Sequence, residues 1–98
     1  MSGNNLYQLE YLESVKIKDI PKLNKSARKI IQKAIEERLM LDPIGFGKPL
    51  IYSLKGHRRL RVSKYRVIYR IIESSKTVLI IAIDNRKDIY KKSNHPKS

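Results

Sequence analysis

The stretch that decides the fold is residues 58–72, RRLRVSKYRVIYRII, in which two runs rich in β-branched and aromatic residues flank Ser63-Lys64. Such runs favour extended strands, and two residues are enough for a tight hairpin loop. A third run of this kind, Thr77–Ile83, follows after a short polar spacer. The sequence therefore predicts an antiparallel meander of three strands over residues 58–62, 65–72 and 77–83.

The hairpin loop determines which side chains share a face of the predicted sheet. A loop at Ser63-Lys64 pairs Arg61 with Arg66, and alternation along the strands then puts Arg59, Arg61 and Arg66 on one face. We call these three residues the arginine patch. The other face carries apolar side chains that suit burial, namely Leu60, Val62, Tyr65 and Val67.

The last predicted strand brings a fourth arginine toward the patch. If Ile72 pairs with Thr77, Arg66 lies opposite Ile83, and the chain that leaves this strand delivers Arg86 to the same place. Like charges that face one another destabilise a sheet, so an anion bound at the patch is the favoured explanation. The alternative is a solvated strand face whose arginines extend into water.

The residues before the meander predict a strand and a first helical segment. Leu6–Leu12 is rich in Leu and Tyr and favours a strand, whereas Glu13–Leu23 is helical in part. Proline is not tolerated in a helix interior, so a break or a fresh helix start is expected near Asp19–Pro21.

A second helix has the clearest pattern in the chain. Either Asn24 or Ser26 can cap it, and it should end at about Leu41, because Asp42 precedes Pro43 and a residue before proline avoids the helical region. Its apolar residues fall at helical spacing: Ala27, Ile30, Ile31, Ala34 and Ile35. Residues 44–56 contain three glycines and a proline and predict a loop with a short extended piece.

Length and composition predict one globular domain over residues 1–98, with 91–98 as a flexible tail. Cysteine is absent, which excludes disulfides, thiolate metal sites and a cysteine nucleophile. The N-terminus lacks the pattern of a signal peptide, and the longest apolar block, Val78–Ile83, is too short to cross a bilayer. We therefore expect a cytoplasmic protein without a membrane partner.

The net charge of +13 favours a polyanionic partner, which can be RNA, DNA, an anionic membrane or an acidic protein chain. Residues 1–50 hold 9 basic and 6 acidic residues, whereas residues 51–98 hold 13 and 3, so the excess lies in the C-terminal half. The acidic residues are scattered, and no metal site or other cofactor is predicted. His57 adjoins the arginine-rich strand and is a candidate RNA contact, whereas His95 lies in the predicted tail.

From the meander onward, the sequence resembles the RelE branch of the RelE/ParE superfamily of type II toxins. The runs that carry the resemblance are Phe46–Leu50, Leu54–Gly56, Arg58–Val62, Tyr65–Ile71 and Ile83–Tyr90, in this order and spacing. The resemblance implies an α+β fold with two N-terminal helices packed on a four-stranded, mainly antiparallel sheet. It also implies cleavage of mRNA, typically in the ribosomal A site, and a cognate antitoxin as partner.

Carried over position by position, the resemblance makes Arg61, Arg66, Arg86 and Tyr90 the predicted catalytic residues. Contacts to RNA are expected from their neighbours, namely His57, Arg58, Arg59, Lys64 and Lys87. Many relatives have glycine in the hairpin where this chain has Ser63-Lys64. Many also have a histidine where this chain has Asn85, so the chain offers no imidazole at that position.

The predicted reaction is attack of an RNA 2′-hydroxyl on the adjacent phosphate, which needs no metal ion. The arginines would stabilise the negative charge of the transition state, and Tyr90 would either transfer a proton or stack on a base. Two alternatives stay open. One is a ParE-like toxin directed at DNA gyrase, and the other is a module that binds RNA or the ribosome without cutting.

Overall fold

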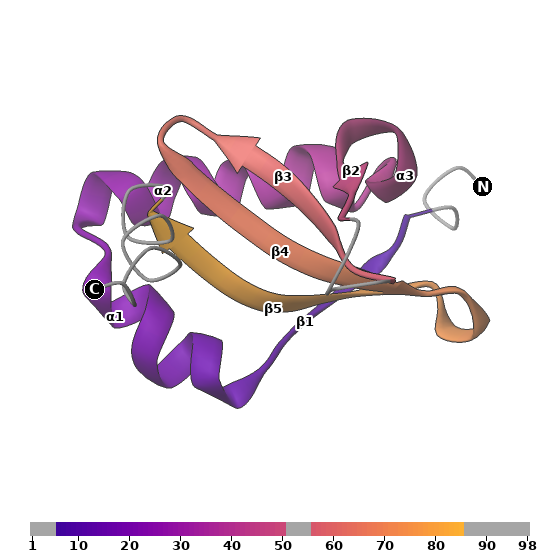
Figure 1. Cartoon of the computed structure of the whole chain (residues 1–98), viewed down its shortest axis with the longest axis horizontal. Helices are drawn as coiled ribbons and strands as arrows, with labels where there is room; N and C mark the ends of the chain where they lie inside the picture. Colours follow the sequence, from indigo (N-terminus) through magenta and orange to yellow (C-terminus); the bar gives the residue numbers. More distant parts are fainter. Residues whose placement is uncertain (1–5, 51–55, 86–98) are drawn as a thin grey trace, which may run out of the picture.

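The computed structural model describes residues 6–50 and 56–85 and has helices packed on one face of a mainly antiparallel sheet (Figure 1). The strand order is β1-β5-β4-β3-β2. The strands are β1 (Gln8–Tyr11), β2 (Lys48–Pro49), β3 (Arg58–Val62), β4 (Tyr65–Ile72) and β5 (Thr77–Asn85). The helices are α1 (Ile20–Lys22), α2 (Lys25–Ala34) and α3 (Pro43–Phe46), with π-helical turns at Val15–Asp19 and Ile35–Leu39 and a 3-10 turn at Glu73–Ser75.

The predicted meander is confirmed, including its register at the hairpin. Arg61 pairs with Arg66 and Val62 with Tyr65, and Ser63 adopts a left-handed φ of 58° in the two-residue loop. One feature raises the strand count from the expected four to five, namely the two-residue β2, which pairs with the start of β3. The predicted N-terminal strand is present as β1, and the structure pairs it in parallel with β5.

The register between β4 and β5 differs from the prediction. Ile72 does pair with Thr77, but a bulge leaves Ile81 without a partner, so Arg66 lies opposite Asp84 and not opposite Ile83. The physical reason is burial. The extra residue turns Ile83 inward opposite Val67, where it is 4% exposed, whereas the unbulged register would place it on the face of Arg66.

Helical structure runs from residue 13 to residue 22 without the expected interruption at Pro21. The π-helical turn Val15–Asp19 widens the backbone just before the proline, and α1 starts at Ile20, within the range where a fresh start was expected. Such a widened turn is one way in which a helix accommodates a residue that cannot donate a backbone hydrogen bond. The chain turns extended at Leu23.

Helix α2 begins at the predicted cap, since Asn24 Oδ1 accepts a hydrogen bond of 2.8 Å from the Ala27 amide. Ala27, Ile31 and Ala34 are buried, as the apolar spacing predicted, whereas Ile30 is exposed. The π-helical turn Ile35–Leu39 completes the segment two residues before the predicted end at Leu41.

The core lies between the sheet and α2, which passes behind the strands in Figure 1. Its largest fully buried side chains include Val15, Ile35, Leu39, Val67, Tyr69 and Ile80. We call the other face of the sheet, which carries the arginine patch, the outer face. No helix among the described residues is long and apolar enough to cross a membrane.

Candidate nucleic-acid interface

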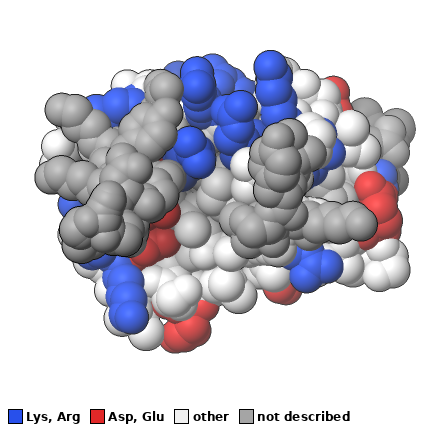
Figure 2. Space-filling model, viewed as in Figure 1, with Lys and Arg blue, Asp and Glu red and all other residues white. Residues whose placement is uncertain are grey.

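The arginine patch lies on the outer face, where β3 and β4 run side by side. Its position follows from alternation, because Leu60, Val62 and Val67 are buried on the core side and force their neighbours outward. Arg59 and Arg61 come from β3, and Arg66, on β4, is the Cα partner of Arg61. In Figure 2, Lys and Arg side chains gather over the upper part of the view. The Arg61–Arg66 pair sets two like charges opposite one another across the hairpin.

Arg66 is a partly buried member of the patch. It lies between Arg61 on β3 and Asp84 on β5, and its Nε is buried without a hydrogen-bond partner among the described residues. Leaving a buried donor unsatisfied costs about 1–3 kcal/mol, and more for a charged group. Arg66 as a whole is partly exposed on the outer face, and its planar guanidinium is suited to an anionic acceptor such as a phosphate.

Arg58 does not lie with the arginine patch, although it was predicted as an RNA contact. It pairs with Tyr69 in the sheet and donates from its guanidinium to the carbonyls of Ile44, at 2.8 Å, and Gly47, at 3.2 Å. These bonds attach α3 to β3. Arg58 therefore holds the neighbouring backbone in place.

Tyr69 supports the same region from within the core. Its hydroxyl donates to the Pro43 carbonyl, and a Cβ added at Gly47 would come within 1.8 Å of the hydroxyl oxygen. Burial raises the pKa of Tyr69, with Arg58 acting in the opposite direction. The turn that carries α3 is therefore fixed to the sheet by two side chains.

The remaining predicted contacts lie at the two ends of β3. Lys64 is exposed in the hairpin loop, with its Nζ 5.8 Å from the centre of the Tyr65 ring, which packs on the core side of the sheet. His57 precedes β3 at the opposite end of the strand and is partly buried. The structure thus directs Lys64 toward the Tyr65 ring and not toward the arginine patch, and it leaves His57 at the far end of the strand.

Arg86, Lys87 and Tyr90 lie outside the described residues, as does His95. The described part of β5 ends at Asn85, which is the Cα partner of Tyr65, next to Arg66. The strand that leads to Arg86 therefore ends beside the arginine patch.

A basic hollow, which the sequence did not predict, lies at the β2–β3 edge, and we call it the edge hollow. It has a volume of about 320 Å³ and is lined by Arg38, Phe46, Lys48, Arg59, Leu60 and Arg61. The sequence signal was weak, because Phe46 and Lys48 belong to a stretch that predicted only a loop with a short extended piece. Arg38 is separated from them by the end of a helix.

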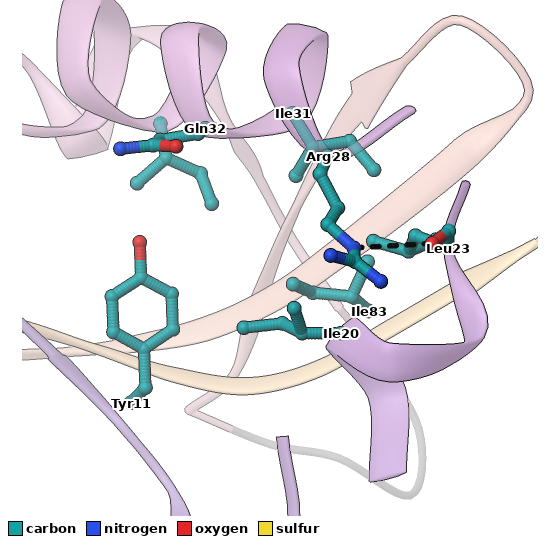
Figure 3. Close-up of a pocket in the computed structure, with 8 residues that line it drawn as sticks. Tyr11, Ile20, Leu23, Arg28, Ile31, Gln32 and Ile83 are labelled. Atoms are coloured by element: carbon teal, nitrogen blue, oxygen red, sulfur yellow. Dashed lines mark hydrogen bonds between the residues drawn. The ribbon is translucent and has the colours of Figure 1, made fainter. Parts of the chain in front are cut away.

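A second hollow, of about 270 Å³, lies between the helices and the sheet and is mostly apolar (Figure 3). Tyr11 from β1 and Ile83 from β5 face Ile31 from α2 across it. Arg28 also lines it and donates from Nε to the Leu23 carbonyl at 3.1 Å. Burial, with a smaller contribution from Glu36, raises the pKa of Tyr11, which favours a neutral phenol here.

Known proteins resemble this chain in sequence and in structure. A sequence model of the family described as "ParE toxin of type II toxin-antitoxin system, parDE" matches residues 14–90. Toxin RelG of Mycobacterium tuberculosis is 41% identical over 54 residues, which span 55% of this chain and 62% of that protein.

Two solved structures show how far the fold agrees. A chain of the toxin-antitoxin complex RelBE2 from Mycobacterium tuberculosis superposes with a TM-score of 0.78 and 28% identity, over 83% of this chain and 99% of that one. The isolated RelE toxin of E. coli gives a TM-score of 0.66 and 22% identity, over 94% of this chain and 99% of that one. At that identity, the second likeness shows the fold alone. The family match covers most of the chain, and the chain therefore belongs to the RelE/ParE family of toxins from type II toxin-antitoxin systems.

Proposed function

We propose that this toxin is an endoribonuclease that cuts mRNA on the translating ribosome without a metal ion. The observation that carries the proposal is the cross-strand pair Arg61–Arg66, with Arg59 on the same face of the sheet. Within those residues, no three His, Asp or Glu side chains gather as a metal site would require. Arginine is the side chain best suited to a phosphate in such a setting.

The proposed reaction is an internal transfer within the RNA. The 2′-oxygen loses its proton and bonds to the adjacent phosphorus, the bond to the 5′-oxygen breaks, and that oxygen takes up a proton. The products are a 2′,3′-cyclic phosphate and a 5′-hydroxyl. Arg61, Arg66 and Arg86 would hold the extra negative charge of the transition state, and each donor of this kind typically contributes ~10²- to 10³-fold in rate.

Proton transfer is assigned to Tyr90, with stacking on a base as its alternative role. Asn85 has no group that titrates, so it cannot replace the histidine that many relatives carry there. We also propose a cognate antitoxin as the partner, since the RelBE2 relative was solved as a toxin-antitoxin complex. An antitoxin that covers the arginine patch would block the phosphate site.

The test is a cell-free translation reaction in which new 5′ ends are mapped on the message. Arg66→Ala, Arg86→Ala and Tyr90→Phe should each reduce cutting, and EDTA should leave it unchanged. Arg70→Ala is the matched control, because Arg70 is an exposed arginine four residues along the same strand. Equal cutting by the wild type and Arg66→Ala would contradict the role of the patch.

A gyrase-directed activity is the second candidate, because the matching family carries the ParE description. It predicts intact message together with loss of DNA supercoiling by purified gyrase. The same protein preparations, including Arg66→Ala, can be added to both assays. Supercoiling that stops while the message stays intact would replace the ribonuclease proposal.

A further inference from the structure

We infer that the edge hollow is a subsite for one nucleotide of single-stranded RNA, whose base stacks on Phe46 while Arg38, Lys48 and Arg59 hold its phosphates. The inference rests on the proposed function, since it extends the same RNA beyond the phosphate that is cut. The volume of about 320 Å³ lies at the lower end of the range of ligand pockets, roughly 300–1,000 Å³.

Phe46 is the only phenylalanine of the chain, and it is 50% exposed. Its helix, α3, is nevertheless firmly attached. Asp42 Oδ1 accepts from the Gly45 amide at 2.9 Å, Arg58 donates to the carbonyls on either side of Phe46, and Tyr69 donates to Pro43. An aromatic ring that stays half exposed on a fixed turn is a preorganised stacking surface, and every base offers a face to it.

The charges around the ring form a row across the sheet. Lys48 on β2 is the Cα partner of Arg59 on β3, just as Arg61 is the partner of Arg66. Arg38 adds a fourth cation to the hollow from the helical side. Among residues 6–50 and 56–85, none of the cations lining the hollow forms an ion pair. Two like-charged pairs side by side favour a ligand that carries phosphates in series.

Arg59 and Arg61 join the edge hollow to the arginine patch, because both line the hollow and belong to the patch. They stand two residues apart on β3, about 7 Å, which is a distance on the scale of one nucleotide. A strand of RNA cut at Arg61–Arg66 would therefore place a neighbouring nucleotide at Phe46. An acidic protein segment would use the charges but would gain less from a flat aromatic surface, so we favour RNA.

The experiment measures binding of two labelled polyanions to the full chain by fluorescence anisotropy. One is an eight-nucleotide RNA with 2′-O-methyl groups, which lacks the attacking hydroxyl, and the other is inorganic polyphosphate, which lacks bases. Phe46→Ala should weaken RNA binding by roughly 5- to 150-fold and leave polyphosphate binding unchanged. Phe46→Tyr should restore RNA binding, and Arg38→Gln should weaken both ligands.

Ile44→Ala is the control, since Ile44 is an exposed apolar residue on the same helix that does not line the hollow. It should bind RNA as the wild type does, and thermal melting should show that all variants fold. Normal RNA binding by Phe46→Ala overturns the inference, as does an equal loss of RNA and polyphosphate. A third labelled probe, an acidic peptide that contains leucine, tests for a protein partner. If Phe46→Ala weakens the binding of this peptide alone, the hollow belongs to a protein partner and the inference is overturned.

The message-cutting assay separates this inference from the proposed function. If Phe46→Ala loses RNA affinity but the wild type cuts no message, the subsite stands and the ribonuclease proposal fails. If the wild type cuts and Phe46→Ala binds normally, the ribonuclease stands and the subsite fails.

Discussion

Gly47 and Tyr69 form the tightest contact behind the candidate site. A methyl group at Gly47 would lie 1.8 Å from the Tyr69 hydroxyl oxygen and 2.9 Å from the Arg59 carbonyl oxygen. The carbonyl belongs to β3 and cannot move independently of the sheet. Packing at this point therefore leaves room only for glycine and couples α3 to the strand that carries the arginine patch.

Gly47→Ala should lower the free energy of unfolding by about 1–3 kcal/mol, because the added methyl overpacks the contact. Urea denaturation measures the loss. Tyr69→Phe removes the nearest oxygen. In a protein that already carries Tyr69→Phe, adding Gly47→Ala should therefore lower the free energy of unfolding by less than it does in the wild type. Additive effects of the two substitutions would show that the hydroxyl is not what the methyl meets.

The raised pKa of Tyr69 also predicts how the stability of the protein depends on pH. Burial raises its pKa above the ordinary value of 10.0. A group whose pKa is raised on folding contributes stability below its unfolded pKa and loses it as the pH rises through the folded value. The melting temperature should therefore fall above about pH 10. The decline of the melting temperature should be smaller in Tyr69→Phe. An unchanged decline would assign the effect to other groups, such as Tyr11, whose pKa is also raised.

Helix α2 offers a matched test of how its start is specified. The sequence allowed Asn24 or Ser26 as the cap, and Asn24 is the residue that accepts the Ala27 amide at 2.8 Å. Asn24→Ala should destabilise the protein by about 0.5–2 kcal/mol, because the amide loses its acceptor. Ser26→Ala should have little effect in the same denaturation experiment. A larger loss from Ser26→Ala would contradict the cap seen here.

The strands show which parts of the site could be predicted from sequence and which could not. The two-residue loop at Ser63-Lys64 predicted the pairing of Arg61 with Arg66, and alternation put both arginines on the face opposite the buried Leu60. The bulge at Ile81 depends on how Ile83 packs against the helices, which is a tertiary effect. Sequence reasoning therefore placed Ile83, and not Asp84, opposite Arg66.

The edge hollow could not be predicted for a related reason. Its side chains come from the end of a helix, a one-turn helix and two strands, and nothing in their spacing along the chain brings them together. Their meeting depends on the bonds from Arg58 and Tyr69 that fix α3. The sequence suggested Arg58 for RNA binding and placed Tyr69 only within a strand, so neither residue was expected to hold α3.

Across the whole molecule, the charge of +13 should make RNA binding strongly dependent on salt. Each phosphate contact on a single strand contributes about −0.7 to the slope of log affinity against log salt, so three contacts from the arginine patch give a slope of about −2. Raising salt from about 50 to 200 mM should then weaken binding roughly 20-fold. Contacts at the edge hollow would make the slope steeper.

Substitutions can separate the effect of individual phosphate contacts from the effect of the protein's net charge. Arg61→Gln should reduce the slope by about 0.7, because one phosphate contact is lost. Lys33→Gln removes the same charge from an exposed side chain of α2, away from the outer face. The Lys33 Nζ lies 4.0 Å from Glu37, and its loss should leave the slope unchanged. If both variants flatten the slope equally, net charge alone drives the association. RNA would then have no preferred path over the arginines, and the case for a cutting site at Arg61 and Arg66 would lose its basis.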